Sequence, residues 1–307
     1  LASWERSWER GRDALGARVR AKIVRGITHL TTGSGPTLDF SSPPGDPGLF
    51  GPDAVCWQVH ADFTAMMVGG ISALMLQALH PLALAGVWDH STFRTDMLGR
   101  LRRTATFISG TTFGNRADAL ALIERVKRIH LAVSGTAPDG RPYRASDPAL
   151  LTWVHVAEVS SFMAAHLRYV NPALSIGEQD RYYAEMAMIA QLLGAEDVPR
   201  SRAEVATYLA TMRPALEAGP RVQEVVAVLA HAAPKGRLMR PAGALVFRAG
   251  VDSLPRWAQD LIGFSAPARY AGKLARQGVR MIAPAMRWAL VNGASKRARR
   301  RVAAQVV

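Results

Sequence analysis

Residues 147–169, DPALLTWVHVAEVSSFMAAHLRY, decide the fold class. An Asp followed by Pro is typical of a helix start, because the Asp side chain caps free backbone N–H groups and Pro is tolerated at the first helical position. Apolar residues and one imidazole then recur at intervals of four, four and three on one helical face: Leu151, His155, Val159 and Phe162. The stretch predicts a long helix.

The same helical periodicity recurs along most of the chain, whereas strand signals are nearly absent. Further helices are expected at residues 54–78, 82–90, 95–108, 117–133, 176–193, 201–216, 221–230, 242–261 and 267–291. Gly and Pro within residues 134–143 predict a turn or a small hairpin. We therefore predict an all-α fold.

The length of 307 residues allows one large core or two ordinary domains. We expect one helical domain over residues 54–292, preceded by a helix and a Pro/Gly-rich surface loop (1–53) and followed by a basic tail (293–307). Apolar types make up 49% of the chain, which excludes a disordered protein. The single Cys56 excludes an internal disulfide, a thiolate zinc site and a c-type haem, which needs paired cysteines.

The longest uncharged run, Phe63–Leu79, has 17 residues. A membrane-spanning helix needs roughly 20 predominantly apolar residues, so we expect this run to be a buried core helix. Residues 1–25 lack the apolar segment of a secretory signal. A cytoplasmic protein is the resulting expectation.

Basic residues outnumber acidic ones by 38 to 24, giving a net charge of +14. The densest basic cluster is Lys296–Arg301, which we expect to be a frayed tail. No aromatic residues are interleaved with it, so nucleic acid is not an expected partner. Weak contact with an anionic membrane surface is favoured instead, because Met281–Val291 just before it is apolar on one side. The chain would then be membrane-peripheral.

A first group of candidate site residues lies in the segment 99–107, GRLRRTATF. Two guanidiniums, a hydroxyl and an aromatic ring fall on one helical face: Arg100, Arg103, Thr104 and Phe107. Like charges on one stripe repel unless an anion, a carboxylate or a ligand lies between them. The alternative is a solvated face.

Two histidines are expected on buried helical faces. His130 continues an apolar stripe with Leu122, Val126 and Val133, and His155 lies within the stripe described above. An imidazole in such a place is either a metal ligand or a core side chain that is hydrogen-bonded to a carbonyl.

Taken together, the sequence resembles the MpaB-like oxygenase family, which includes the latex-clearing rubber oxygenases. The resemblance extends over about residues 59–216 and is carried by short pieces in order: QALHP (77–81), GVWDHS (86–91), GRLRRT (99–104), HLAVSG (130–135), GRPYRA (140–145), WVH (153–155), DRYY (180–183) and VP (198–199). No single piece is specific, whereas the ordered set is.

The resemblance implies a globin-like helical enclosure of one b-type haem and dioxygen chemistry at its iron. His130 matches the family's proximal iron ligand, and Arg100 and Thr104 match residues on the distal side of the haem. Arg100 or Arg103 could instead pair with the haem propionates. His155 is a reserve ligand, which would replace His130 or sit opposite it.

Two positions depart from the rubber oxygenases. Arg103 occupies a place where those enzymes have Lys, so the charge is kept while its reach and geometry change. They also use a Glu as base upstream of the Arg/Thr motif, where this chain offers only Asp89 and Asp96 at other offsets. The departures argue against oxidative cleavage of a polyisoprene double bond.

The expected function is therefore a haem-b-dependent oxidoreductase that uses dioxygen or peroxide on a small apolar organic substrate. The Met-rich run 63–79 and the region of Trp88 are expected to line its pocket. One alternative is a haem sensor or carrier without turnover, with His130 and either His155 or His80 as axial ligands. Another is a helical binding protein without metal. A hydrolase is not expected, because no Gly-x-Ser-x-Gly motif is present.

Overall fold

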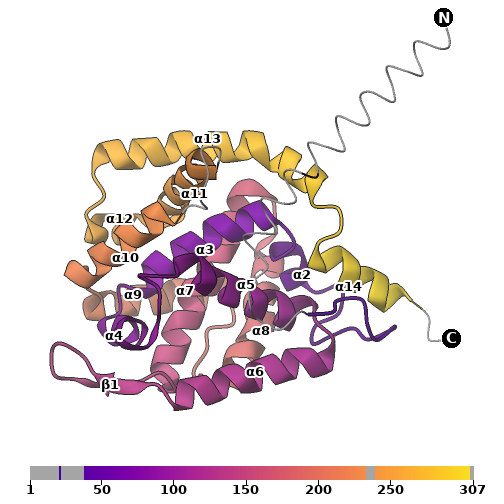
Figure 1. The fold of residues 1–307 in the computed structure, drawn as a ribbon, viewed down its shortest axis with the longest axis horizontal. Coiled ribbons are helices and arrows are strands. Elements are labelled where there is room, and N and C mark those ends of the chain that lie inside the picture. The colour runs from indigo at the N-terminus through magenta and orange to yellow at the C-terminus, as the bar shows by residue number, and fades with distance from the viewer. Residues whose placement is uncertain (1–20, 22–37, 233–238, 305–307) are drawn as a thin grey trace, which may run out of the picture.

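The computed structural model describes residue 21 and residues 38–232 and 239–304 (Figure 1). Its helices are α2 (Val55–Val59), α3 (Phe63–Gln77), α4 (Pro81–His90), α5 (Met97–Phe113), α6 (Arg116–Leu131), α7 (Pro148–Tyr169), α8 (Ile176–Leu193), α9 (Arg202–Met212), α10 (Pro220–His231), α11 (Met239–Ser253), α12 (Arg256–Ile262), α13 (Ala266–Ala289) and α14 (Ala294–Ala303). The predicted N-terminal helix lies outside the described residues. The all-α prediction is confirmed.

The helix α7 begins where the sequence predicts. The Asp147 side chain accepts hydrogen bonds from the backbone N–H groups of Ala149 and Leu150, and Pro148 occupies the first helical position. Asn115 likewise caps α6 by accepting from the N–H of Asp118. These local signals fix the starts of two helices that carry candidate site residues.

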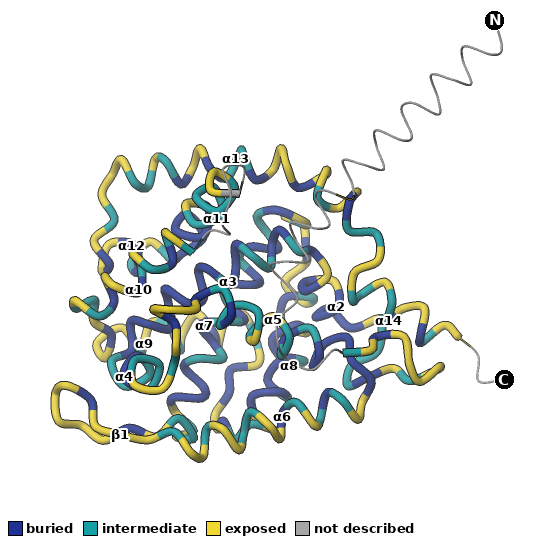
Figure 2. The backbone as a smooth tube through the Cα atoms, viewed as in Figure 1, coloured by how far each residue is buried: buried dark blue, intermediate teal, exposed yellow. Residues whose placement is uncertain are grey.

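The core is built around the pair α3 and α7, which pack along each other. On one side, α11 lies against α3 and α13 covers α11, while on the other α6 packs against α5 and α8 (Figure 1). Gly69 permits the close approach of α3 and α7, because a Cβ placed there would lie 2.9 Å from the Phe162 ring. Figure 2 shows α3 as largely buried, which confirms the prediction for the run 63–79.

Within the described part of the chain, none of the helices by itself has the length and hydropathy of a membrane span. The pair α3 and α4 passes the same criterion only when its two members are taken together, and they are bent by 108° relative to each other.

A small antiparallel hairpin follows α6. Its strands are β1 (Ser134–Thr136) and β2 (Pro142–Arg144), with Gly135 opposite Tyr143. The predicted turn at residues 134–143 is therefore a hairpin. It packs on α4, where the Tyr143 hydroxyl donates to Asp89 at 2.6 Å.

Two predicted helices are each divided in the structure. The expected helix at 54–78 breaks after α2, because Asp62 adopts an extended conformation and caps α3 by accepting from the N–H of Ala65 at 2.8 Å. The expected helix at 242–261 breaks at Leu254 and Pro255, since Pro lacks the N–H that a continuing helix would need.

The C-terminal basic segment differs from the expected frayed tail. It forms α14, whose Arg301 is 1% exposed. The Arg301 guanidinium donates to the carbonyls of Asp46, Phe113 and Gly114 at 2.9, 2.9 and 3.2 Å. One cation of the cluster thus holds α14 against the end of α5, while Arg299 and Arg300 beside it remain exposed.

Candidate functional site

Arg100 on α5 and Glu158 on α7 form the electrostatic centre of the candidate site. The guanidinium of Arg100 is half-buried and donates to the Ser91 hydroxyl at 2.9 Å. Burial lowers the pKa of Arg100, and the nearby carboxyl of Glu158 opposes that change. Burial in turn raises the pKa of Glu158 to about 7, with Arg100 acting in the other direction. This carboxyl can therefore take up or release a proton near neutral pH.

His130 and His155 each carry a buried ring nitrogen without a partner. Among the described residues, neither Nδ1 of His130 nor Nε2 of His155 has a hydrogen-bond partner. Burial lowers the pKa of His130 and lowers that of His155 to about 4, so both rings are neutral at neutral pH. A buried polar atom left unpaired costs about 1–3 kcal/mol, and neutral imidazole is the form that binds iron. Both nitrogens thus fit a ligand that is not part of the chain.

The pairing of α5 with α6 brings Arg100 and His130 to the same end of a helical hairpin. The two helices are joined by Gly114 and Asn115 and pack together, with Gly110 against Leu122. Arg100 lies 114 − 100 = 14 residues before the joint, and His130 lies 130 − 115 = 15 residues after it. Because each helical residue advances about 1.5 Å, the two side chains lie at similar heights along the pair.

The helix α4 closes this end of the hairpin. Gly86 lies against Val133 and Tyr143, and the His90 ring nitrogen Nε2 lies 3.1 Å from the carbonyl oxygen of Ser134. Ser91, which ends α4, accepts the hydrogen bond from Arg100. The helix ends that carry Arg100 and His130 are therefore held by the same element.

Thr104 and Glu158 each lie about one helical turn from another candidate site residue. Thr104 is half-buried and lies one helical turn after Arg100 on α5. His155 precedes Glu158 by three residues and shares its face of α7. The structure thus places Arg100 near Glu158, whereas no measured contact joins His130 to His155.

Arg103 and His80 have other surroundings. The Arg103 side chain is 60% exposed, with a guanidinium nitrogen 3.7 Å from a carboxylate oxygen of Asp96. His80 caps α4, where its Nδ1 accepts from the N–H of Ala83 at 3.5 Å, and its ring lies 6.0 Å from that of Trp153. Arg103 faces solvent, and one nitrogen of His80 is already used in the fold.

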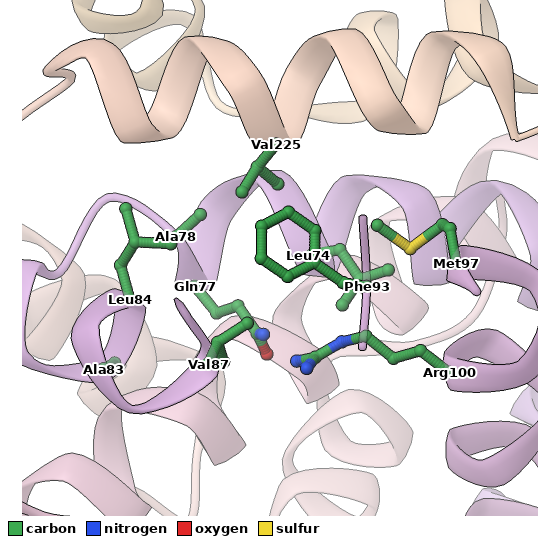
Figure 3. A pocket seen from close by; sticks show the side chains of 10 residues that line it. All are labelled: Leu74, Gln77, Ala78, Ala83, Leu84, Val87, Phe93, Met97, Arg100 and Val225. Atoms are coloured by element: carbon green, nitrogen blue, oxygen red, sulfur yellow. The ribbon is translucent and has the colours of Figure 1, made fainter. Parts of the chain in front are cut away.

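A small apolar recess lies beside Arg100 (Figure 3). Its walls come from α3, α4, α5 and α10, through Leu74, Gln77, Ala78, Ala83, Leu84, Val87, Phe93, Met97, Arg100 and Val225. The Gln77 amide and the Arg100 guanidinium face each other across it (Figure 3). The recess has a volume of about 10 Å³, room for about one water.

The lining agrees in part with the predicted pocket. Residues of α3 contribute, as expected for the run 63–79, but its methionines do not. Trp88 lies outside the lining, where it contacts the Phe93 ring at 5.7 Å and carries the Arg94 guanidinium 3.6 Å above its ring.

Glu158 and Gln77 are the site residues that sequence reasoning missed. A carboxylate was expected only in the stretch before Arg100, whereas Glu158 comes from a helix later in the chain. A charged residue three positions after His155, on a helix with an apolar face, was the available signal. Nothing in the sequence pattern indicates that Gln77 faces Arg100.

Side chains alone do not form a metal centre in the part of the chain that the structure describes, which contains no group of three or more His, Cys, Asp or Glu residues able to hold an ion. An arrangement with one imidazole ligand, in which a porphyrin supplies four nitrogens, is compatible with His130 or His155.

A helical bundle with a half-buried guanidinium near a half-buried carboxyl, and with two unpartnered imidazole nitrogens, is an arrangement typical of enzyme sites. Comparison with known families makes this specific. Residues 57–288 match the family described as ER-bound oxygenase mpaB/B′/rubber oxygenase, catalytic domain, and the chain belongs to that family. It is therefore an oxygenase-type catalytic domain, as the sequence motifs predicted. No curated protein and no solved structure matched the chain.

Proposed function

We propose that the protein is a haem-b-dependent oxidoreductase that uses dioxygen or peroxide on a small apolar organic substrate, within a globin-like enclosure. The observation that carries the proposal is the buried, unpartnered Nδ1 of His130 at the end of the hairpin that also bears Arg100. His130 would hold the iron, and His155 is the reserve ligand. When bound, the haem supplies a redox-active iron at which the oxidant is activated.

Arg100 and Thr104 act on the distal side in this proposal. A guanidinium and a hydroxyl donate hydrogen bonds toward negative charge that develops on the oxidant, and such donors are stronger where water is scarce. Gln77 adds an amide that faces Arg100 across the apolar recess. Arg103, at 60% exposure, would act at the rim or toward a haem propionate.

Glu158 is the proton-handling group of the proposal. Its pKa of about 7 allows it to hold a proton below neutrality and to accept one above it, and the Arg100 charge stabilises the ionised form. Glu158 thus supplies a carboxyl from α7 rather than from the stretch before Arg100.

A haem sensor or carrier without turnover is the second candidate. The unpartnered Nε2 of His155 favours it, since a second imidazole opposite His130 would close the iron to the oxidant.

A carbon monoxide difference spectrum of the reduced, haem-loaded protein separates the two candidates. A shift of the Soret band on adding carbon monoxide supports an open iron position and the oxygenase proposal. A low-spin spectrum that does not change supports the carrier. A protein that binds no haem in a stoichiometric titration would contradict both.

A further inference from the structure

A cleft of about 460 Å³ lies on the other side of α7 from His155. Ser160, Ala164 and Arg168 contribute to it from α7, and helical periodicity places them opposite the His155 face. The remaining walls come from α3, α9, the α11–α12 joint and α13. The cleft is therefore separate from the proposed haem site.

The cleft carries a strong excess of positive charge. Five of its lining residues are cationic and one is anionic: Arg168, Arg256, Arg269, Lys273, Arg276 and Asp252. If Asp260, which pairs with Arg256 and Arg269, is also counted, the excess is 5 − 2 = 3. Lys273 and Arg256 are exposed, whereas Arg168, Arg269 and Arg276 are partly buried, so the cleft offers two accessible cations to an anion.

Part of this charge has a structural role. The Asp252 carboxylate is 6% exposed and accepts from Arg276 Nε and Nη2 at 2.7 Å each and from Arg168 Nη1 at 3.1 Å, which ties α13 and α7 to α11. Lys273 differs, because it has no ion-pair partner among the described residues. The cleft thus retains an uncompensated ammonium beside two guanidiniums that share one carboxylate.

The cleft also has apolar walls and an unused polar atom. Leu76, Leu209 and Leu254 line it, and so does Ser161, whose buried hydroxyl has no hydrogen-bond partner in the described structure. A ligand that satisfies these walls has an anionic head and an apolar part.

We propose that this cleft binds an organic anion, a phosphate monoester or carboxylate with a short apolar chain, whose head lies between Lys273 and Arg256 and whose chain contacts the leucines. The site does not depend on haem binding or on the proposed oxidoreductase activity.

Calorimetric titration with hexyl phosphate tests the proposal, with hexanol and inorganic phosphate as comparison ligands. The double variant Lys273→Gln/Arg256→Gln should weaken hexyl phosphate binding about 10-fold or more, since a charge-assisted contact is worth at least about one decade. Arg200→Gln, an exposed arginine outside the cleft, is the matched control and should bind like wild type.

The proposal predicts that hexyl phosphate binds more tightly than inorganic phosphate or hexanol. It also predicts that this binding is weakened in the double variant and not in Arg200→Gln. Equal binding of inorganic phosphate and hexyl phosphate would contradict the role of the apolar walls. Absence of binding at millimolar hexyl phosphate, or unchanged binding in the double variant, would overturn the site. Circular dichroism checks that each variant is folded.

An independent observation concerns the outer face of α13, which runs along one edge of the molecule (Figures 1 and 2). Four large apolar residues on it are exposed by 64, 57, 80 and 46%: Tyr270, Leu274, Met281 and Trp288. They recur at intervals of four, seven and seven residues and so form one stripe.

Each residue of this stripe directly follows a basic one, in the pairs Arg269–Tyr270, Lys273–Leu274, Arg280–Met281 and Arg287–Trp288. The helix contains no acidic residue. An apolar stripe beside a row of cations, with aromatic rings near both ends, is typical of a helix that lies in the interface of a membrane.

From this pattern we infer that α13 rests on an anionic phospholipid surface, with its stripe among the acyl chains. The exposed Arg280 and Arg287 would lie near the headgroups, although both also donate to the fold, to the carbonyl of Arg168 and to Asp62. The weak membrane contact expected from the sequence would then be made by the exposed stripe of α13.

Vesicle co-sedimentation tests this surface, with phosphatidylcholine vesicles against vesicles that contain one-fifth phosphatidylserine. Wild type should bind the anionic vesicles, and Leu274→Ser/Met281→Ser should weaken binding about 10-fold or more, because each buried side chain contributes about 1.5–3 kcal/mol. Ile129→Ser/Leu131→Ser, which removes two exposed apolar residues of α6, is the control.

Binding that needs phosphatidylserine and is lost only in the α13 variant supports the inference. No binding to either vesicle, or equal losses in both variants, would overturn it. Light scattering that shows a dimer for wild type and a monomer for Leu274→Ser/Met281→Ser would also overturn the inference, because the face would then join two copies of the chain.

Discussion

Arg100 on α5 and Glu158 on α7 lie close enough for each to shift the pKa of the other. Burial disfavours the charged form of both, and their opposite charges offset part of that cost. The two residues are separated by 58 positions in sequence (158 − 100) and lie on the two helices that carry Thr104 and His155. A proton on Glu158 therefore changes the charge facing Arg100.

Stability should depend on pH through Glu158. Its pKa rises from 4.5 to about 7 on folding, so the folded state holds a proton more tightly than the unfolded state. Its contribution is fully present below about pH 4.5 and is lost as the pH rises through about 7. The free energy of unfolding of Glu158→Gln minus that of wild type should therefore increase between pH 4.5 and pH 8, by at most about 3 kcal/mol.

Urea unfolding at pH 4.5, 6 and 8 measures this difference. Comparing variant with wild type at each pH removes the contributions of buried histidines, whose pKa values are lowered and whose stabilisation is lost as the pH falls. A stability difference that does not change with pH would contradict the assignment.

Arg100 should stabilise an anion bound at the iron of the haem-loaded protein. Arg100→Ala is expected to weaken cyanide binding about 10- to 100-fold, since a hydrogen bond to a charged group contributes about 1.5–3 kcal/mol. Arg125→Ala, which changes an exposed arginine of α6 outside the proposed site, is the matched control. Titration followed at the Soret band measures both, and equal effects in the two variants would argue against a special place for Arg100.

Arg301 should be essential to stability although it belongs to a basic cluster. Arg301→Ala leaves three carbonyls, those of Asp46, Phe113 and Gly114, without their donor, and should lower the free energy of unfolding by about 2–4 kcal/mol. Arg300→Ala, its exposed neighbour, should change it by less than about 0.5 kcal/mol. Chemical denaturation measures both free energies of unfolding. Equal values for Arg301→Ala and Arg300→Ala would contradict the structural role of Arg301.

Adjacent glycines of α3 should respond in opposite directions to the same change. Gly69→Ala would place a methyl group 2.9 Å from the Phe162 ring and 3.1 Å from the Ser161 carbonyl oxygen, so it should destabilise the α3–α7 pair by about 1–3 kcal/mol. Gly70→Ala meets nothing within 4 Å and should stabilise α3 by about 0.5–1 kcal/mol. Thermal unfolding checks both, and effects of the same sign would contradict the packing.

The elements of the fold follow from local sequence wherever a cap or period marks them. Asp147 and Asn115 open α7 and α6 as predicted, and Ile176–Leu193 has the predicted bounds. Pro255 could have indicated the break between α11 and α12, because proline interrupts a helix. The helical periodicity on both sides of it predicted one continuous helix instead.

The features that the sequence did not predict depend on contacts between distant segments. The burial of Arg301 depends on carbonyls at the end of α5, 187 positions earlier, and a run of similar arginines does not indicate which one turns inward. The approach of Glu158 to Arg100 and the cationic cleft likewise depend on how α7 meets its neighbours. The motifs identified the family and the candidate ligands, but not the carboxylate beside them.

The most direct test of the haem proposal is the absorbance spectrum of His130→Gly beside wild type, each reconstituted with haem, with and without added imidazole. We predict that the variant loses the wild-type Soret spectrum and that imidazole restores it, because the free base fills the place of the missing ring. His155→Gly should keep the wild-type spectrum. A His130→Gly protein that binds haem with an unchanged spectrum would contradict the assignment of His130 as the iron ligand.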